Sequence, residues 1–385
     1  MRIGLLTTSF PRFEGDTAGH FVHGFADALA RRGHTLEVLA PEPPEGAAPC
    51  FDGMELSWVP YMRPRGLART FYGAGVPDNL RRDPAAWLGI APFTAALAAA
   101  ALRRSHRWDA VVSHWALPCG VIGSRLAALP HLCVVHSADM WLLSRLPGRR
   151  ALAHGIASAQ TRMWFVAPHL RDQFEALLPA GRPAQRSVHV GPMGCAPPPP
   201  TRRDEAMAGR LRVLSMGRLV PIKGLDVLIE SIAGLPGVSL TVAGEGPQRD
   251  ALASLARRLG ADVQFVGHVE GEHKARLLAG ADVLCLPSRT LDSGRSEGAP
   301  TGVIEAMAAG LPVVASDTGG VSSLLRDGVH GRIIPPGDPT LLGQALARLR
   351  DAASERARMG AAAADHARQF AWPRLAAQAE DMLTG

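Results

Sequence analysis

Short apolar segments, each followed by a turn and a helical segment, recur along the whole chain. In the first half this pattern predicts strands at 3–7, 36–39, 110–112, 132–135, 164–166 and 188–190. In the second half it predicts strands at 212–216, 239–243, 263–266, 283–286, 312–315 and 332–334. Runs such as 109–112 (DAVV) and 311–315 (LPVVA) suit parallel strands with helices on both faces. Each half is therefore predicted to be an α/β unit with an open, doubly wound sheet.

Four consecutive prolines at 197–200 mark the boundary between the halves. Proline-rich segments form stiff spacers, and 385 residues exceed the roughly 250–300 at which a single core stops growing. We therefore expect an amino-terminal domain at 1–196, a linker at 197–204 and a carboxy-terminal domain at 205–364. The two sheets are expected to face each other across a cleft. Residues 365–385 are expected to form a final helix that can pack back on the amino-terminal domain.

Positive charge is concentrated in one segment, although the net charge of the chain is only +6. Against Asp78 and Asp83, residues 58–108 contain eight arginines: Arg63, Arg65, Arg69, Arg81, Arg82, Arg103, Arg104 and Arg107. The same segment contains Trp58, Tyr61, Met62, Phe71, Tyr72 and Trp87. Such a patch attracts an anionic membrane surface or a phosphorylated acceptor, with a solvated loop region as the alternative. Nucleic acid is not an expected partner, because no recognisable binding module accompanies the charge.

The cysteines and the first residues favour a cytoplasmic protein. Five scattered cysteines, none spaced as CxxC, favour reduced thiols over disulfides or a zinc site. Met1-Arg2 runs directly into a predicted strand, without a signal-peptide pattern. Residues 85–102 are uncharged over 18 positions, about the length of a membrane span. Because they contain Gly89, Pro92 and mostly alanine, a helix at about 94–104 packed on a sheet is the preferred interpretation.

The strongest candidate for chemistry is the segment 296–312 (SEGAPTGVIEAMAAGLP). It has the pattern of a loop that opens a helix, since Pro300 suits a helix start. Gly310 followed by Pro312 suits the end of that helix. The amino terminus of such a helix offers partial positive charge and free N–H groups to a phosphate.

Two carboxylates and two glycines in this segment could form a binding site. Gly298 and Gly302 leave room for a ligand to approach the backbone. Glu297 before the helix and Glu305 inside it can hold two separate sets of hydroxyls, such as those of a sugar and a ribose. A capping acid and a solvated helix acid remain the alternative.

Glu297 and Glu305 form an E-x7-E pair. With residues 305–316 (EAMAAGLPVVAS) and Gly319-Gly320, this segment resembles glycosyltransferase family 4, a retaining family with the GT-B fold. Other segments resemble further motifs of the family: 9–11, 19–21, 30–38, 114–120 (HWALPCG), 136–139 (HSAD), 216–224 (MGRLVPIKG) and 242–247 (VAGEGP). The resemblance covers nearly the whole chain. It implies a GT-B enzyme of two Rossmann-like domains, in which the second binds a nucleotide sugar and the first binds the acceptor.

The resemblance also assigns roles to residues of the second half. Arg218 and Lys223 would bind the donor diphosphate, Glu305 the ribose hydroxyls, and Glu297 the transferred sugar. The backbone that would line the donor consists of Gly298, Ala299, Pro300, Thr301 and Gly302. On spacing alone, two cations in a glycine-bearing loop after a strand can reach one anion, with two solvated cations as the alternative.

Further candidate contacts come from the first half and from a strand end. His136 follows a predicted strand and would lie beside the reacting sugar, whereas a structural histidine is the alternative. Gly19 would let the first loop approach the diphosphate, although that loop lacks the family's usual adjacent glycine pair. Val266 and His268 would lie near the donor base.

These expectations combine into one mechanism. Arg218, Lys223 and the helix amino terminus would neutralise the departing diphosphate. No acidic metal-binding cluster is evident, so a metal and a cofactor are not expected. The alternatives are a nucleotide-sugar epimerase of related fold and a nucleotide-sugar-binding protein without transfer activity. The donor base, its sugar and the acceptor are not determined by the sequence.

Overall fold

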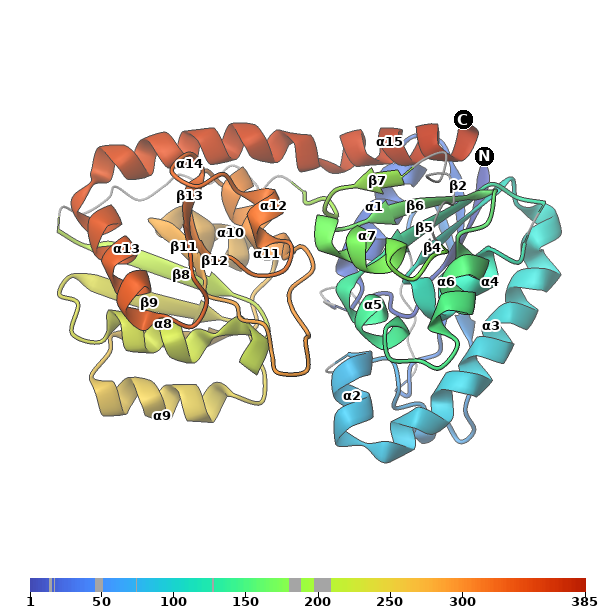
Figure 1. The fold of residues 1–385 in the computed structure, drawn as a ribbon, viewed down its shortest axis with the longest axis horizontal. Helices are drawn as coiled ribbons and strands as arrows, with labels where there is room; N and C mark the ends of the chain where they lie inside the picture. Colours follow the sequence, from blue (N-terminus) through green and yellow to red (C-terminus); the bar gives the residue numbers. More distant parts are fainter. Residues whose placement is uncertain are drawn as a thin grey trace. The chain divides into compact units, whose positions relative to one another are not determined.

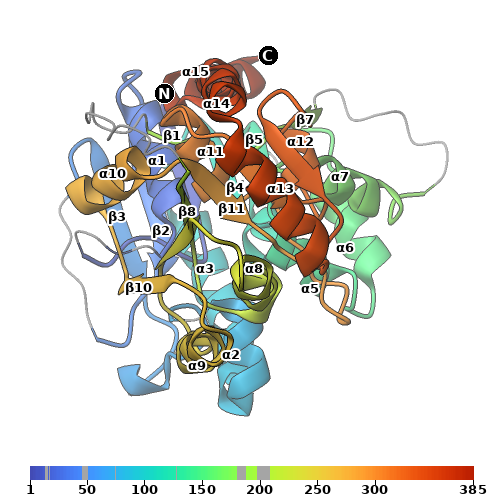
Figure 2. The same ribbon diagram turned by 90° about the vertical axis from the view of Figure 1, so that its left-hand side faces the viewer.

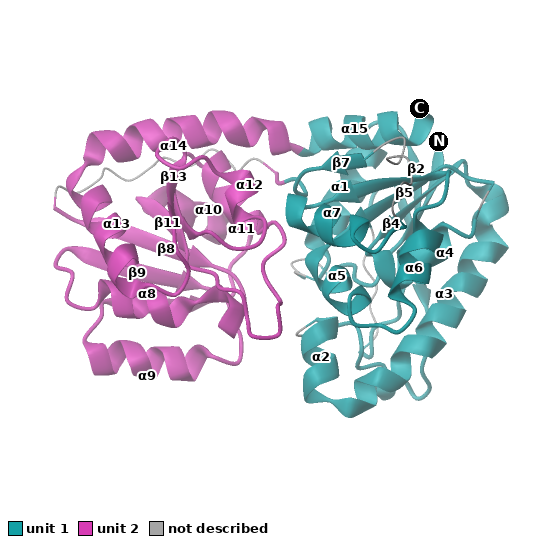
Figure 3. Cartoon of the chain, in the orientation of Figure 1, with its two compact units in different colours: residues 1–194, 372–385 teal, residues 195–371 magenta. Residues whose placement is uncertain are grey.

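The computed structural model describes residues 1–13, 16, 18–45, 51–73, 75–126, 128–179, 188–196 and 209–385. It divides into two compact units (Figure 3). Unit 1 consists of residues 1–194 together with 372–385, and unit 2 of residues 195–371. The predicted linker, 197–204, lies outside the described residues.

The described part of unit 1 contains a seven-stranded sheet in the order β3-β2-β1-β4-β5-β6-β7. Figure 1 labels its strands β2, β4, β5, β6 and β7. Its strands are β1 (Arg2–Leu6), β2 (Thr35–Pro41), β3 (Met54–Val59), β4 (Ala110–His114), β5 (His131–Val135), β6 (Thr161–Phe165) and β7 (Val188–Val190). All neighbouring strands run parallel. The order reverses between β1 and β4, which makes this pair the switch point of the sheet.

The helices of unit 1 connect these strands. They are α1 (His20–Ala30), α2 (Val76–Arg82), α3 (Ile90–Arg104), α4 (Val121–Gly123), α5 (Ser137–Leu143), α6 (Arg149–Ile156), α7 (Pro168–Glu175) and α15 (Trp372–Thr384). Short turns of other helix types occur at η1 (Arg65–Leu67), η2 (Pro84–Gly89), η3 (Ser105–Arg107) and η4 (Ala116–Gly120). Helix α15 follows the residues of unit 2 in the chain, but it belongs to unit 1 and packs against α1.

The described part of unit 2 contains a parallel six-stranded sheet in the order β10-β9-β8-β11-β12-β13. Its strands are β8 (Leu211–Met216), β9 (Val238–Ala243), β10 (Val263–Gly267), β11 (Val283–Leu286), β12 (Val313–Ser316) and β13 (Gly331–Ile334). Its helices are α8 (Leu225–Ile232), α9 (Arg249–Leu259), α10 (Gly271–Gly280), α11 (Thr301–Ala308), α12 (Val321–Leu324), α13 (Pro339–Asp351) and α14 (Ala353–Ala367). Turns η5 (Pro221–Lys223) and η6 (Arg368–Phe370) complete it.

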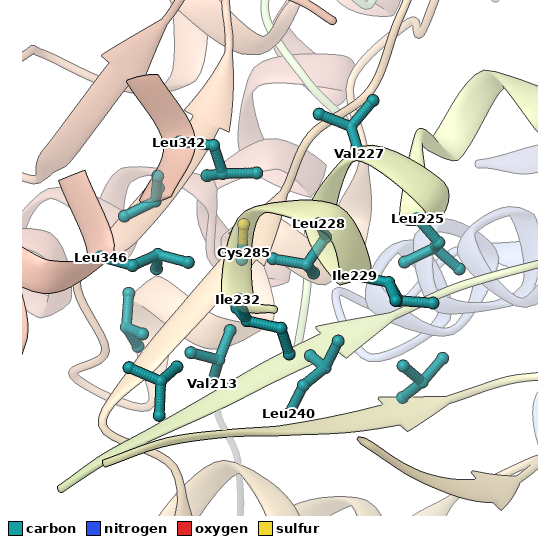
Figure 4. Close-up of a cluster of buried hydrophobic side chains, with 14 of the residues drawn as sticks. Val213, Leu225, Val227, Leu228, Ile229, Ile232, Leu240, Cys285, Leu342 and Leu346 are labelled. Atoms are coloured by element: carbon teal, nitrogen blue, oxygen red, sulfur yellow. The ribbon is translucent and has the colours of Figure 1, made fainter. Parts of the chain in front are cut away.

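Two buried apolar clusters cover the two faces of the unit 2 sheet. One contains side chains of α8, α9 and α13 packed on the strands, among them Leu252 of α9. Leu228 of α8 and Leu346 of α13 are labelled in Figure 4. The other contains side chains of α10, α11, α12 and α14, such as Ile304. The two groups of helices lie on opposite sides of the sheet (Figure 2). This arrangement confirms the predicted doubly wound sheet and explains why its strands are apolar on both faces.

Each predicted strand overlaps a strand of the structure, but one described strand was missed. Strand β3 pairs only with β2 and forms the edge of its sheet. Its side chains alternate between apolar and polar, and most of them are partly exposed. An edge strand with one solvated side lacks the continuous apolar run that identified the others.

The apolar segment near residue 94 forms a helix on the sheet, as predicted. Helix α3 begins at Ile90, contacts β1, β2 and β3, and buries Phe93 and Leu97 completely. Within the described residues, 84–107 is a helical stretch with the length and composition that could cross a membrane. Packing of α3 on the sheet buries part of the apolar surface of this stretch.

The contact between α1 and α15 depends on a glycine. A Cβ atom added to Gly24 of α1 would lie 2.7 Å from the Trp372 ring of α15. No other residue therefore fits at position 24 without displacing that ring.

We expect Gly24→Ala to destabilise unit 1 by about 1–3 kcal/mol, as overpacking commonly does. Gly155→Ala in α6 is the matched control, because its new Cβ would have only the end of the Arg125 side chain at 3.9 Å. It should be stabilising by about 0.5–1 kcal/mol. Urea unfolding followed by tryptophan fluorescence measures unit 1 alone, because the chain's seven tryptophans all lie there. A midpoint for Gly24→Ala equal to or above that of the wild type would contradict this packing.

Candidate functional site

The switch point of the unit 2 sheet lies between β8 and β11, where the strand order reverses. Ligands of open α/β sheets bind at the carboxyl ends of the strands at this point. The loop after β8 contains residues 217–224, and the loop after β11 runs from 287 to 300. These loops carry Arg218, Lys223 and Glu297, three of the predicted site residues.

An ion pair joins the two loops. Lys223 Nζ lies 2.9 Å from Glu297 Oε1, and the side chains are only 15% and 13% exposed. Pairs that are shielded from water interact more strongly than pairs on an open surface. The predicted cation and the predicted carboxylate are therefore neighbours, and each limits the positions that the other can take.

Glycines let the backbones around this ion pair approach closely. Gly224 has a φ of +61°, and a Cβ there would lie 2.0 Å from the Pro287 carbonyl oxygen. Gly319 has a φ of +57°, and a Cβ there would lie 1.9 Å from the Glu297 carbonyl oxygen. The N–H of Gly320 donates to the same oxygen at 3.3 Å. The predicted Gly319-Gly320 motif thus holds the backbone of Glu297.

Helix α11 begins beside Glu297 with an open amino terminus. Pro300 is its N-cap and provides no side-chain cap, and the first turn contains no acidic side chain. The N–H groups of this turn therefore have no side-chain acceptor from the cap, and the helix dipole adds positive potential there. This segment includes the predicted Gly298, Ala299, Thr301 and Gly302.

Glu305 also has a lysine partner, which the sequence interpretation missed. Lys274 Nζ of α10 lies 3.0 Å from Glu305 Oε1, with 34% and 18% of the side chains exposed. Nothing in the spacing of α10 distinguishes Lys274 from a solvated helix lysine, so only the tertiary structure identifies it.

Burial, and then the charge of Glu305, raise the pKa of the nearby Cys195 thiol to about 12, which agrees with a reduced, unreactive cysteine.

The remaining predicted residues of unit 2 are Arg218, Val266 and His268. Arg218 is exposed and follows β8 directly after Gly217. Val266 is in β10, the edge strand two positions from β8. His268 is 45% exposed and lies 2.8 Å from Glu270. Neither Val266 nor His268 is a member of the two lysine–glutamate ion pairs.

His136 lies at the carboxyl end of β5 in unit 1, as predicted, and caps α5. Its Nε2 is 3.3 Å from Nδ1 of His114. The rings of Phe21 and Trp115 lie 5.1 and 5.0 Å from its ring. The carboxylate of Asp139 accepts hydrogen bonds from the backbone N–H groups of Ala116 and His136.

Burial sets the protonation of this cluster. It lowers the pKa of His136 to about 3, and it holds the pKa of His114 well below the usual value, where the charge of His136 adds to the effect. Burial raises the pKa of Asp139 to about 7. His131, at the start of β5, is also buried, with Ser113 and Thr161 as hydrogen-bond partners, and burial lowers its pKa to about 3. The histidines are therefore neutral at physiological pH, so His136 can contribute a dipole but not a positive charge.

Gly19 is the N-cap of α1, at the carboxyl end of β1. Its φ is +66°, and a Cβ there would lie 2.3 Å from the Ser9 carbonyl oxygen. The structure thus places Gly19 and His136 in unit 1 and the other candidates in unit 2. Within the described parts of both units, no group of three or more His, Cys, Asp or Glu side chains could hold a metal.

Known proteins of similar sequence and structure support one class of function. Residues 201–366 match the family model described as glycosyl transferases group 1. The chain is 29% identical to a phosphatidyl-myo-inositol mannosyltransferase of Mycobacterium leprae, over 98% of this chain and 95% of that protein. The fold is similar to that of sucrose-phosphate synthase from Thermosynechococcus elongatus, with a TM-score of 0.77, 18% identity and coverage of 99% and 98% of the two chains. It is also similar to Anabaena HepE solved with UDP, with a TM-score of 0.71, 19% identity and full coverage of both chains.

The chain is a glycosyltransferase with the GT-B fold. The predicted fold class is confirmed by these solved structures. The prediction of sugar transfer, over its two alternatives of an epimerase and a non-catalytic binding protein, is confirmed by the family model and the relative of similar sequence. The parallel sheets supply the switch points at which such enzymes bind ligands.

The histidine cluster predicts how the stability of unit 1 depends on pH. In the unfolded chain, His114, His131 and His136 take up protons near pH 6.5, whereas in the folded chain they remain neutral. The free energy of unfolding should therefore fall as the pH drops from about 6.5 to 5, by roughly 1–3 kcal/mol per unit. Asp139 opposes this trend. Its pKa in the folded chain is raised to about 7, so the folded chain binds this proton at a higher pH than the unfolded chain does. Tryptophan-monitored unfolding should show a steeper dependence for Asp139→Asn than for the wild type, and a flat wild-type profile would contradict the assignment.

Proposed function

We propose that this enzyme moves a sugar from a nucleotide diphosphate with retention of anomeric configuration and without a metal ion, the donor lying at the carboxyl edge of the unit 2 sheet. The observation that carries the proposal is the ion pair between Lys223 and Glu297, because a cation and a carboxylate meet there at the switch point. Retention is supported by the resemblance of the E-x7-E segment to a retaining family.

The positive groups of unit 2 would stabilise the leaving diphosphate. Lys223, Arg218 and the open amino terminus of α11 lie on or next to the loops after β8 and β11. Such preorganised positive groups favour a transition state in which negative charge grows on phosphate oxygens. No acidic residue occupies the first turn of α11 to oppose them.

The two glutamates would contact different parts of the donor. Glu297 is held by Lys223 and by Gly320, so its carboxylate has a fixed position near the leaving-group cations. Positive charge grows on the sugar as its bond to phosphate breaks, and a fixed carboxylate stabilises that charge. Glu305 lies inside α11 with Lys274, and it would accept hydrogen bonds from the ribose, which does not change during the reaction.

Metal independence is tested by chelation. Because Arg218, Lys223 and the amino terminus of α11 would supply the positive charge that a metal ion provides, sugar transfer should keep its rate in the presence of EDTA. The assay first identifies the donor by thermal shift with UDP-, GDP- and ADP-sugars, since a ligand of the folded state raises the unfolding temperature. Complete loss of transfer in EDTA, restored by Mg²⁺ or Mn²⁺, would contradict the proposal. NMR of the anomeric proton of the product tests retention in the same reaction.

Glu297 and Glu305 should fail differently when the charge is removed. Glu305→Gln should weaken donor binding by about 1.5–3 kcal/mol, the contribution of a hydrogen bond to a charged group, and should raise KM more than it lowers kcat. Glu297→Gln should lower kcat more than it weakens donor affinity, because its interaction strengthens in the transition state. Steady-state kinetics and calorimetric donor titration of both variants distinguish these effects. An unchanged kcat in Glu297→Gln would contradict the transition-state role of Glu297 and leave it with a structural role only.

We also propose that the acceptor is lipid-linked and that the enzyme works at the cytoplasmic surface of a membrane. The relative from Mycobacterium leprae is named for a phosphatidylinositol acceptor, which is a membrane lipid. The structure narrows the basic segment that would bind such a surface. Arg63 and Arg65 each lie 2.6 Å from Glu42, and Arg104 lies 2.9 Å from Glu37. Acidic residues from outside the segment therefore neutralise part of its charge.

The aromatic part of the expected docking segment is also smaller than predicted. Tyr61, Phe71 and Tyr72 are at most 8% exposed and belong to the core of unit 1, so their expected role on the surface is wrong. Their rings instead pack under α3, where burial of aromatic area stabilises the fold.

One surface that keeps both exposed apolar side chains and exposed arginines lies around η2 and is defined by Leu67, Arg81, Arg82, Trp87 and Leu88. Trp87 and Leu88 are 51% and 67% exposed, and Leu67 is 45% exposed. Arg81 and Arg82 are exposed and have no acidic partner among the described residues. Turn η2 contacts both η1 and α2, so these side chains come from neighbouring elements. Apolar side chains beside unpaired arginines suit an anionic membrane surface.

Co-sedimentation with vesicles tests this surface. The protein should bind vesicles that contain anionic lipid more tightly than neutral vesicles, and Leu88→Ser and Arg81→Glu should each weaken binding severalfold. Leu259→Ser in α9 of unit 2 is the matched control, because Leu259 is also an exposed leucine, at 39%. Wild-type binding that is equally absent from both kinds of vesicle would rule out the membrane and leave an acceptor site alone.

A further inference from the structure

A carboxylate lies at the edge of unit 2 where the proposed function requires a phosphate to bind. Glu297 Oε1 is 2.9 Å from Lys223 Nζ, the ammonium group that would hold the donor diphosphate. Beside this pair, the first turn of α11 contains no acidic side chain, as suits a site for an anion. The lysine therefore has an anionic partner within the protein itself, and a phosphate group has to share the ammonium or displace that partner.

The main chain on both sides of the ion pair is held by hydrogen bonds. The Arg289 N–H donates to the carbonyl oxygen of Ile222, the neighbour of Lys223, at 2.9 Å. The Gly320 N–H donates to the Glu297 carbonyl oxygen at 3.3 Å. Because these bonds fix both loops, the two side chains cannot be separated by a loop movement that leaves the bonds intact. Glu297 therefore stays within reach of the lysine.

The side chain of Lys223 is confined as well. A Cβ atom added to Gly217 would lie 3.3 Å from Lys223 Cε and 3.6 Å from its Nζ, so the end of the lysine side chain lies against this glycine. Only 15% of the lysine side chain is exposed. A confined ammonium group has few alternative positions, so a phosphate group has to approach it where Glu297 already lies.

Two anions on one ammonium group repel each other. Hydrogen bonds of about 2.8 Å from a single Nζ place their two acceptors at most about 5.6 Å apart. At this separation, in a site shielded from water, the repulsion between like charges exceeds thermal energy. In the proposed mechanism, the positive charge that grows on the sugar offsets this repulsion. A nucleoside diphosphate that has lost its sugar no longer has that compensation.

We propose that Glu297 also promotes product release: its carboxylate competes with the nucleoside diphosphate for Lys223 and weakens binding of the product once the sugar has been transferred. The inference rests on the proposed function, which places the diphosphate on Lys223 and the sugar beside Glu297. It explains why a carboxylate lies among the positive groups of this edge. The same charge stabilises the transition state and destabilises the product complex, so one residue favours both the transfer and the step that follows it.

The test is the sign of an affinity change. Glu297→Gln keeps the size of the side chain and removes the competing charge. The probe is whichever of UDP, GDP and ADP binds the wild type most tightly in calorimetric titration. We expect its dissociation constant to fall about tenfold in Glu297→Gln, because a repulsion between charges a few ångströms apart is relieved. Product inhibition of sugar transfer by the same compound should strengthen by a similar factor. A site that was merely damaged by the substitution would bind the probe less tightly.

Two variants serve as matched controls. Glu305→Gln removes a carboxylate of similar exposure that also pairs with a lysine, since Lys274 lies 3.0 Å away. Its dissociation constant for the probe should rise, because Glu305 would hold the ribose, which the product retains. Glu297→Asp keeps the charge and should bind the probe nearly as weakly as the wild type does. If Glu297→Gln does not fold, as judged by circular dichroism, Glu297→Met replaces it, because methionine has a similar length and no charge.

The outcomes separate this inference from the proposed function. Binding of the probe by Glu297→Gln that is equal to or weaker than that of the wild type would overturn the competition and leave the donor site in place. Tighter binding by Glu305→Gln or Glu297→Asp to the same degree as by Glu297→Gln would also overturn it, because loss of the Glu297 charge would then not be the cause. If neither the wild type nor Glu297→Gln binds UDP, GDP or ADP, the donor site of the proposed function is wrong, and the inference falls with it.

Discussion

The ion pair between Lys223 and Glu297 is the contact on which the carboxyl edge of the unit 2 sheet depends. It connects the loops after two adjacent strands, and both partners are largely shielded from water. Removal of one partner of such a pair leaves an uncompensated charge, which costs more than the pair contributes when intact. The electrostatic design of this edge therefore requires both residues together, and a ligand with negative charge competes with Glu297 for the same lysine.

Close backbone contact makes this ion pair possible. Gly224 and Gly319 have positive φ angles, and each lies against a carbonyl oxygen of the loop after β11. A side chain at either position would push that loop away and move Glu297 with it. The glycines thus matter because they lack a side chain and leave room for the neighbouring backbone, rather than because they are flexible. This close packing gives the carboxylate of Glu297 a fixed position.

The number of arginines in residues 58–108 overestimates the positive charge that this part of unit 1 offers to a partner. Residues 58–108 carry a large excess of arginine, yet Glu37 and Glu42 from β2 and the residues after it pair with several of these side chains. Aromatic side chains of the same segment turn inward and form part of the core. Around η2, exposed apolar side chains lie beside arginines that have no acidic partner among the described residues, and the proposed docking surface is therefore smaller than the sequence indicates.

The sequence by itself determined the parallel strands, the two sheets and the E-x7-E segment, because apolar runs and helix-start signals are local properties of the chain. It did not reveal edge strand β3, whose alternating side chains reflect a single neighbour and a solvated face. Nor did it reveal Lys274 as the partner of Glu305. These roles depend on which side chains meet after the chain has folded, and neither spacing nor composition encodes that distance. Local patterning therefore specified the fold and the motif, while packing between distant segments decided the partners of each charge.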